Sequence, residues 1–271
     1  MNFSSYLDEL RFAFVATPNW HSRTALLAAT AKFHANNFFK GVRSDRSPIE
    51  IDVCIGDRAR RIWVRPFAGD IFILYEVLQA ETYLVPDKQI DPESVETIID
   101  CGANIGLTAL YLAGRHKNAR IISVEPDPAN FELLKLNTQS EPRIVPVQAA
   151  IVGGIGRPVV LSQDRPAWGN AVVNAATGAR GVEVPGVTMA ELCVSHGVKT
   201  IDVLKVDIEG AEEEMFSTPD FLEHTRFVMI ELHGQYSLAR FRADIAPMGF
   251  EAHTPATGER PRTITAFPQH R

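Results

Sequence analysis

Cysteine is scarce in this sequence. Only three cysteines occur among 271 residues, at Cys54, Cys101 and Cys193, and none forms a CxxC pair. A disulfide framework needs an even set of paired cysteines in an oxidising compartment. We therefore expect three reduced thiols in a cytoplasmic protein, with Cys101 serving as a small buried filler rather than as a nucleophile.

Long apolar runs and dense basic blocks are also missing. No apolar run reaches the roughly 18 residues that a membrane-spanning helix needs, so we expect no membrane span. The first ten residues carry early acids and lack the basic-plus-apolar pattern of a signal peptide. The formal net charge is −6, with Lys and Arg scattered. The scattered basic residues are compatible with a local basic patch, but they disfavour nucleic acid as the main partner.

The composition fits one large α/β domain with an N-terminal addition, since 45% of the residues are hydrophobic. We place the extension at residues 1–90 and the main domain at residues 91–271. Apolar spacing predicts helices over residues 1–48, broken at Pro18. These helices suit a lid, a dimer surface in a homo-oligomer, or simple packing, which is the default expectation.

A hairpin and a helix are predicted between these helices and the main domain. Residues 49–65 alternate around Gly56-Asp57, as a β-hairpin does. A helix is expected over residues 70–79, with Asp70 as a candidate N-cap.

Strands and helices alternate through the main domain. Expected strands after the first core strand cover residues 121–124, 144–151, 201–206 and 227–232, followed by an antiparallel pair over 251–254 and 263–267. Expected helices cover residues 105–115, 127–138, 189–194 and 238–246. Residues 162–181 are expected to form a long irregular loop, in which Trp168 either covers a ligand or packs locally.

The organising stretch is residues 98–106, Ile-Ile-Asp-Cys-Gly-Ala-Asn-Ile-Gly. An apolar run ends in an acid and is followed by two glycines four residues apart, which predicts a strand, a tight turn and a helix N-terminus. Glycine lets a ligand approach the backbone closely, and such crevices lie at the carboxyl ends of parallel strands. Asp100 either accepts the ammonium group of an amino-acid moiety or caps the loop.

Glu125 ends the next strand, 25 residues after Asp100. An acid at this place is suited to accept both hydroxyls of a ribose. The turn reads G-x-x-x-G rather than the G-x-G-x-x-G of dinucleotide folds. Together with the acid at position 100, this pattern favours S-adenosylmethionine over a nicotinamide cofactor.

Residues 203–214, Val-Leu-Lys-Val-Asp-Ile-Glu-Gly-Ala-Glu-Glu-Glu, place a lysine inside an apolar strand. Strand alternation puts Lys205, Asp207 and Glu209 on one side if the strand geometry persists. A buried lysine needs a partner, so these residues form either a structural ion-pair lattice or part of a site at the strand end.

Glu231 and His233 close the fifth strand and point the same way by strand alternation. A histidine titrates near neutral pH, so His233 is our candidate base for removing a hydroxyl proton, with Asp207 or Glu209 as runner-up. Asp207, Glu231 and His233 also offer ligands for a divalent metal, although we do not expect a metal.

These motifs resemble the FkbM family of S-adenosylmethionine-dependent methyltransferases. The resemblance lies in residues 98–106, in Val-Glu-Pro-Asp-Pro at 124–128, and in Leu-Lys-Val-Asp-Ile-Glu-Gly-Ala-Glu at 204–212, which is the most specific. It covers roughly residues 64–234. It implies an α/β fold with a doubly wound, mostly parallel seven-stranded sheet whose last strand is antiparallel. It also implies O-methylation of a small-molecule hydroxyl acceptor, often a sugar or natural product.

The resemblance further implies roles for individual residues. The methionine part would lie near the glycine turn, the ribose near Glu125, and the adenine near Gln148, Ala149 and Ala150. A helix before the core brings Glu76 and Tyr83 within reach of the cofactor. The full expected cofactor set is Glu76, Tyr83, Asp100, Gly102, Ala103, Asn104, Gly106, Glu125, Pro126, Gln148, Ala149 and Asp207. The expected catalytic set is His233, Asp207, Glu209 and Lys205.

Two other classes of function compete with this interpretation. A nicotinamide-dependent oxidoreductase would use a similar fold, but the G-x-G-x-x-G turn is missing. A non-catalytic cofactor-binding or assembly protein would use the N-terminal helices for contacts. The acids at positions 207, 209, 212 and 231 argue against that class.

Overall fold

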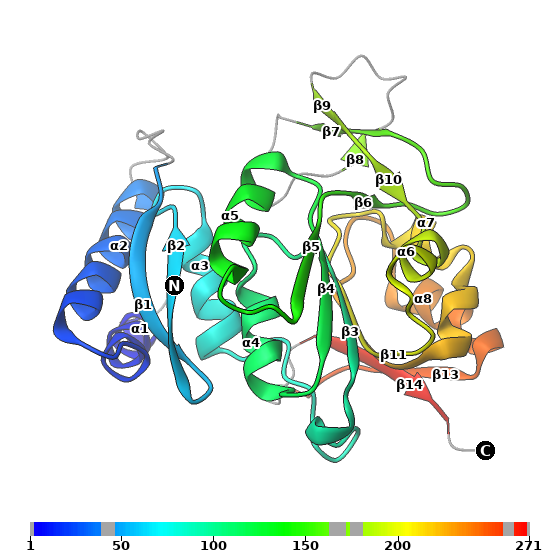
Figure 1. The fold of residues 1–271 in the computed structure, drawn as a ribbon, viewed down its shortest axis with the longest axis horizontal. Coiled ribbons are helices and arrows are strands. Elements are labelled where there is room, and N and C mark those ends of the chain that lie inside the picture. The colour runs from blue at the N-terminus through cyan, green and yellow to red at the C-terminus, as the bar shows by residue number, and fades with distance from the viewer. Residues whose placement is uncertain (1–2, 39–46, 163–171, 174–180, 257–262, 270–271) are drawn as a thin grey trace.

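A seven-stranded sheet with the order β13–β14–β12–β11–β3–β4–β5 forms the centre of the molecule (Figure 1). The computed structural model describes residues 3–38, 47–162, 172–173, 181–256 and 263–269. The sheet strands are Thr97–Cys101 (β3), Arg120–Val124 (β4), Ile144–Val147 (β5), Ile201–Val206 (β11), Thr225–Ile230 (β12), Phe250–His253 (β13) and Ile264–Pro268 (β14). Strands β5, β4, β3, β11 and β12 pair in parallel, whereas β14 is antiparallel to β12 and β13. The predicted sheet, with its antiparallel last strand, is confirmed.

Helices cover both faces of this sheet, as the strand sequences require. Neighbouring strand residues enter opposite cores, with Ile98 and Val203 in one and Ile99 and Leu204 in the other. The main-domain helices are Leu107–Arg115 (α4), Pro128–Thr138 (α5), Met189–His196 (α6), Glu212–Phe216 (α7) and Leu238–Ile245 (α8). Residues of α4 and α5 belong to the first core, and residues of α6, α7 and α8 belong to the second. The fold is therefore the expected doubly wound α/β class.

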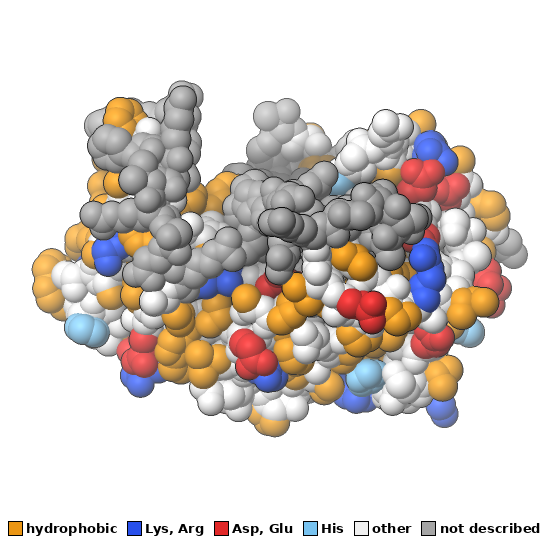
Figure 2. Space-filling view, turned by 90° about the horizontal axis from the view of Figure 1, so that it is seen from above, with side chains coloured by type: hydrophobic (Ala, Val, Ile, Leu, Met, Phe, Trp, Pro, Cys, Tyr) orange, Lys and Arg blue, Asp and Glu red, His pale blue; other side chains and the backbone are white. Residues whose placement is uncertain are grey.

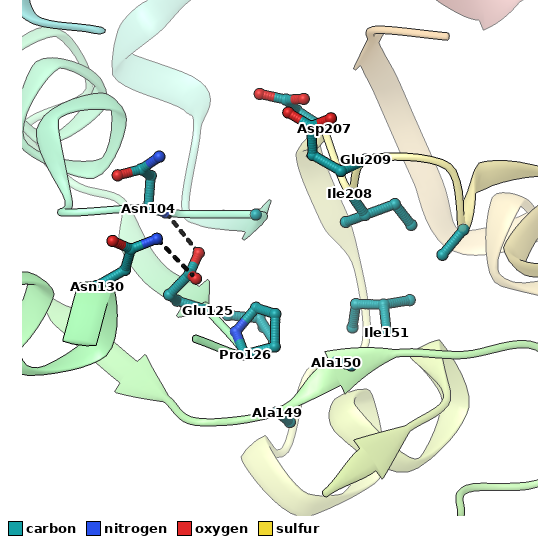
Figure 3. A pocket seen from close by; sticks show the side chains of 13 residues that line it. Asn104, Glu125, Pro126, Asn130, Ala149, Ala150, Ile151, Asp207, Ile208 and Glu209 are labelled. Carbon is teal, nitrogen blue, oxygen red and sulfur yellow. Dashed lines mark hydrogen bonds between the residues drawn. The ribbon is translucent and has the colours of Figure 1, made fainter. Parts of the chain in front are cut away.

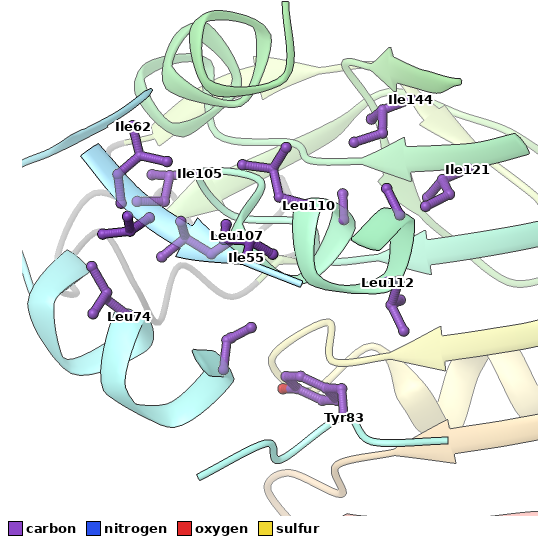
Figure 4. Packing of buried hydrophobic residues seen from close by; sticks show 14 of the residues in the cluster. Ile55, Ile62, Leu74, Tyr83, Ile105, Leu107, Leu110, Leu112, Ile121 and Ile144 are labelled. Atoms are coloured by element: carbon purple, nitrogen blue, oxygen red, sulfur yellow. The ribbon is translucent and has the colours of Figure 1, made fainter. Parts of the chain in front are cut away.

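The N-terminal elements pack against the first core. They are Phe3–Ala16 (α1), Trp20–Phe38 (α2), Ile49–Ile55 (β1) and Arg58–Val64 (β2), and the last two form the predicted hairpin. Figure 4 shows Ile55 and Ile62 of the hairpin beside Ile105 and Leu107 at the start of α4. Residues of α1 and α2 join the same cluster, which confirms the default expectation of packing. The boundary at residue 90 stays a prediction.

The segment before the core differs in detail from the predicted helix. An α-helix (α3, Asp70–Leu74) continues as a π-helical turn (η1, Tyr75–Gln79). The N-cap is Gly69, whose φ of 90° favours glycine, so Asp70 is the first helical residue instead of the cap. The Asp70 carboxylate accepts hydrogen bonds from the backbone N–H (2.7 Å) and the guanidinium (2.9 Å) of Arg65, and both side chains are buried.

The predicted third strand is split in two. Strand β5 ends at Val147, and Ala150–Ile151 (β6) pairs in parallel with Gly186–Val187 (β10) outside the main sheet. Val159–Ser162 (β7), Val172–Val173 (β8) and Gly181–Val184 (β9) form a small antiparallel sheet. Short 3₁₀ helices cover Pro92–Ser94 (η2), Pro219–His224 (η4) and Ala246–Met248 (η5). Trp168-Gly169-Asn170 and the connection before β14 lie outside the described residues.

Acidic and basic side chains are interspersed on the face shown in Figure 2, among the described residues. In the described part of the chain, no helix combines the length and apolar character needed to cross a bilayer.

Candidate functional site

Two neighbouring cavities lie at the carboxyl ends of β3, β4 and β11. The first cavity has an empty volume of about 580 Å³, and its walls include Gly102, Asn104, Glu125, Ala149 and Asp207 (Figure 3). The second cavity, of about 740 Å³, shares Gly102, Asn104, Asp207 and Glu209 with the first. The ends of parallel strands therefore build one continuous candidate site, as expected for an open α/β sheet.

The glycine turn after β3 fixes one wall of both cavities. Gly102 has a φ of +80°, and a Cβ there would lie 1.8 Å from the backbone oxygen of Asp207, so no other residue fits. The N–H groups of Gly102 and Ala103 both donate to the Val124 carbonyl at 2.9 Å. Asn104 also has a positive φ, of 49°, and its side-chain oxygen accepts from the Ile105 N–H at 2.8 Å. The turn therefore presents its backbone to the cavity in a fixed conformation.

Glu125 lies at the end of β4 with its carboxylate held by three donors, of which Figure 3 shows Asn104 and Asn130. One oxygen accepts from the Asn104 N–H at 2.8 Å, and the other accepts from the Asp127 N–H at 3.0 Å and the Asn130 side-chain amide at 3.3 Å. Burial raises the pKa of Glu125 to about 7, although the two backbone hydrogen bonds act to lower it. A carboxyl group of this kind changes its charge near neutral pH.

Asn130 is a cavity residue that sequence reasoning missed. Asp127 caps α5 by accepting from the N–H groups of Ala129 and Asn130 at 2.9 Å, which orients the first helical turn toward Glu125. The sequence did contain a signal for Asn130. It lies three positions after the helix cap Asp127, which places it in the first helical turn beside the end of β4. Asn130 also accepts from the buried Arg65 guanidinium at 2.7 Å.

Lys205 is buried under the glycine turn. Its ammonium donates to the Gly102 carbonyl at 2.7 Å and lies 3.4 Å from Asp100 and 3.6 Å from Asp207. Burial acts to lower the pKa of Lys205, but Coulombic attraction to Asp100, Asp207 and Glu231 outweighs it and raises the pKa. Lys205 is therefore a permanent cation that ties β11 to the turn. Asp207, one of the acids expected to pair with it, does so.

Tyr83 joins the pre-core segment to the ends of β11 and β12. Its hydroxyl lies 2.9 Å from Asp207 Oδ2 and 2.7 Å from Glu231 Oε1, and its ring lies 5.0 Å from the Lys205 ammonium. Burial raises the pKa of Tyr83, and the negative charges of Asp207 and Glu231 raise it further. The side chain is therefore a neutral hydrogen-bond donor in the second cavity, where Glu76 also lies.

His233 follows β12 and is surrounded by carboxylates. Its Nδ1 lies 2.8 Å from Oε1 of the fully buried Glu212, while Nε2 lies 3.7 Å from Asp207 and 3.9 Å from Glu209. The hydrogen bond to Glu212 raises the pKa of His233 to about 9, against the effect of burial. The imidazole is therefore oriented by Glu212, with Nε2 directed toward the acids of the second cavity.

Three of these side chains have the spacing of a metal site. Asp207, Glu209 and His233 each offer one ligand atom, and these atoms lie within 4.8 Å of one another. The trio expected from the sequence contained Glu231, but that carboxylate meets the Tyr83 hydroxyl instead. Glu209 takes its place because a φ of 54° turns the chain after β11 out of the strand conformation.

The cavities contain most of the cofactor residues expected from the sequence. Gly102, Asn104, Glu125, Pro126, Ala149 and Asp207 line the first cavity, and Glu76 and Tyr83 line the second.

The other four expected residues do not line either cavity. Asp100 is fully buried beside Lys205, Ala103 is buried in the turn, and Gly106 is the N-cap of α4 with a φ of 88°. Gln148 is exposed to solvent. Direct contacts from these side chains to a ligand stay predictions.

The chain is similar in sequence to known proteins. A sequence model of the family described as "Methyltransferase FkbM domain" matches residues 100–252, which is more than half of the chain. Methyltransferase sdnD of Sordaria araneosa is 26% identical over 194 residues, covering 59% of this chain and 73% of that protein. AMB antimetabolite synthetase AmbE of Pseudomonas aeruginosa is 31% identical over 83 residues, covering 31% of this chain and 4% of that protein.

Solved methyltransferase structures are similar only distantly. Precorrin-6y C5,15-methyltransferase from Geobacter metallireducens has a TM-score of 0.41 at 11% identity, covering 70% of this chain and 87% of that chain. The N-terminal domain of human METTL16 in complex with SAH has a TM-score of 0.38 at 15% identity, covering 78% of this chain and 74% of that chain. On the strength of the family match, which contains the glycine turn, Glu125 and the acids after β11, the chain belongs to the FkbM family of methyltransferases.

Proposed function

We propose that this chain uses S-adenosylmethionine to methylate a hydroxyl oxygen of a small molecule, such as a sugar or another natural product. Residues 91–271 form the cofactor-binding domain in this proposal, and residues 1–90 form an extension. The observation that carries it is the shared wall of the two cavities, made by Gly102, Asn104, Asp207 and Glu209. This arrangement suits a cofactor in one cavity and a hydroxyl group in the other.

The first cavity fits the nucleoside part of S-adenosylmethionine. The two oxygens of the Glu125 carboxylate suit the paired hydroxyls of a ribose, and Ala149 and Ile151 provide apolar walls for a base. The cofactor supplies an electrophilic methyl group when it is bound. The residues present therefore support this ligand.

The second cavity provides the groups that would act on the acceptor. We assign removal of the hydroxyl proton to His233 Nε2, with Asp207 and Glu209 as alternative bases. Glu212 keeps the imidazole in one orientation through Nδ1. Positioning of the hydroxyl accounts for a large part of the expected rate, and the base adds about 10²–10⁴-fold. Lys205 holds the turn and Asp207 in place, so we assign it a positioning role.

Methyl-labelled S-adenosylmethionine and a panel of hydroxyl compounds test this function. We expect a calorimetric binding signal for the cofactor, transfer of label to an oxygen of the acceptor, and release of S-adenosylhomocysteine. Uptake of NAD in place of S-adenosylmethionine would support an oxidoreductase. Cofactor binding without transfer to any acceptor would support a binding or assembly protein, and label on nitrogen would refute the O-methylation.

The proposed reaction requires no divalent metal. Asp207, the central member of the candidate trio, is already engaged by Lys205 and Tyr83. We therefore expect turnover to survive exhaustive chelation, with the apo-protein and a magnesium-supplemented sample compared at equal protein concentration. Loss of turnover that magnesium or manganese restores would assign the trio to a metal.

A further inference from the structure

A third cavity, which we call the outer cavity, lies between the N-terminal helices and the ends of β12 and β14. Its empty volume is about 1300 Å³. Helices α1 and α2 contribute Glu9 and Phe33, and the segment of α3 and η1 contributes Phe72, Tyr75 and Glu76. The N-terminal extension therefore builds part of a cavity, in addition to packing on the core.

The outer cavity adjoins the second cavity. Phe72, Glu76 and Glu231 line both of them. The second cavity in turn shares four residues with the first, so it connects the first cavity to the outer cavity. A molecule held in the outer cavity thus has its nearest reacting groups in the second cavity, where His233 and Asp207 lie.

Among the described residues that line the outer cavity, the charged side chains are acids. Glu9, Glu76 and Glu231 are its ionisable acids, and no Lys or Arg occurs among the described residues that line it. The Glu9 side chain is 12% exposed, and its carboxylate lies 2.7 Å from His34 Nε2. Burial and the neighbouring Asp207 raise the pKa of Glu231. Such a wall attracts a cation and opposes an anion.

Aromatic rings supply the remaining recognition surface. Phe72 is 53% exposed, and Phe33 is partly buried beside it in the cavity wall. Tyr75 also lines the cavity, and its hydroxyl is already paired with Thr30 Oγ1 at 2.6 Å. Aromatic faces bind ammonium groups by cation–π attraction and also pack against apolar surfaces.

We propose that the outer cavity is the acceptor site and that it selects a hydroxyl compound carrying a protonated amine and an apolar or aromatic group. Acceptors bearing phosphate or carboxylate are disfavoured by the same acids. This inference rests on the proposed function for the reaction, but it adds the charge of the acceptor and a role for residues 1–48. Glu9 is the distinguishing residue, because it belongs to the outer cavity and to neither of the other two.

Four phenyl glycosides with matched size test the proposal: the glucosaminide, the N-acetylglucosaminide, the glucoside and the glucuronide. Binding to the full chain is measured by calorimetry, with and without S-adenosylhomocysteine. We expect the amine to bind about tenfold tighter than the two neutral glycosides, and the anion to bind most weakly. Equal or tighter binding of the glucuronide would overturn the proposal, as would failure of all four to bind.

Two variants and a control locate the effect. Glu9→Gln is expected to lower the affinity for the amine by about three- to tenfold while leaving the neutral glycosides unchanged. Phe72→Ala is expected to weaken all four probes by a similar factor, because ring contacts do not depend on charge. Glu132→Gln removes an exposed acid of α5 that pairs with Lys135, and it serves as the matched control. An equal effect of Glu9→Gln and Glu132→Gln would place the amine elsewhere.

The two proposals fail separately. Absence of S-adenosylmethionine binding would refute the proposed function, and the amine preference would still be measurable on the protein without cofactor. Cofactor binding with preference for the anionic probe would instead refute the acceptor site alone.

Discussion

The Tyr83 hydroxyl lies 2.9 Å from Asp207, a residue 124 positions further along the chain. The same hydroxyl lies 2.7 Å from Glu231. A phenol has a single proton to donate, so both carboxyl groups are satisfied only when one of them carries a proton of its own. Burial, together with Asp207, raises the pKa of Glu231. Tyr83 therefore couples the pre-core segment to the reacting groups.

Replacing Tyr83 by Phe tests this coupling. The ring keeps its place over Lys205, while the hydroxyl shared by two carboxyl groups is lost. We expect the free energy of unfolding to fall by about 1–3 kcal/mol, measured by urea denaturation, and kcat to fall with it. Tyr111→Phe is the control, because the Tyr111 hydroxyl has only a long contact of 3.4 Å to Glu81. Unchanged stability and kcat in the Tyr83 variant would show that the hydroxyl is not a coupling group.

Local sequence signals were sufficient to predict the strands and the glycine turn, whereas the seven-stranded sheet was implied by the family resemblance. Apolar runs located the strands, and the cap at Asp127 with Pro128 located the start of α5. The split after Val147 was not predicted, because pairing of Ala150–Ile151 depends on residues 186–187, more than 30 positions away. Strand pairing of this kind is decided by tertiary contacts rather than by the local pattern.

The partners of individual site residues were predicted less completely. Period-two alternation offered Asp207 and Glu209 to Lys205, whereas the sheet register places Asp100 directly beside it on the neighbouring strand. Alternation correctly placed Lys205, Asp207 and Glu209 on one side, since all three line the second cavity, although the positive φ of Glu209 ends the strand geometry. The register between strands and the shape of the loop after β11 are non-local, so they were accessible only from the structure.

Lys205→Met tests the buried charge cluster. Asp100, with no exposed surface, would lose its nearest cation, and an uncompensated buried charge costs about 3–5 kcal/mol. We expect a corresponding fall in the unfolding free energy from urea denaturation, and the double variant Asp100→Asn with Lys205→Met should recover part of it. Arg226→Met is the control, because it removes a half-exposed cation paired with Asp202. Equal small effects of both single variants would contradict a buried cluster.

Glu125→Gln tests the ribose contact and its pH dependence. The pKa of Glu125 is about 7 without ligand, and donation from ribose hydroxyls favours the charged form and lowers that pKa. Binding then releases a proton, so the affinity for S-adenosylmethionine should increase as pH rises toward 7 and level off above it, by at most about tenfold per pH unit. Calorimetry in buffers of different ionisation enthalpy measures the proton release. The Gln variant should bind more weakly and lose this pH dependence, and a dependence that persists would assign the proton to another group.

His233→Ala tests the proposed base. The pKa of His233 is about 9, above its ordinary value of 6.5, so the neutral form that accepts a proton becomes populated as pH rises through 9. We expect kcat of the native protein to rise between pH 7 and 9, and the variant to lose about 10²–10⁴-fold in kcat together with that rise. Cofactor affinity should change little, because His233 lies outside the first cavity. His224→Ala, at an exposed histidine, is the control. Full turnover in the His233 variant, or an unchanged pH profile at reduced turnover, would transfer the role of base to Asp207 or Glu209.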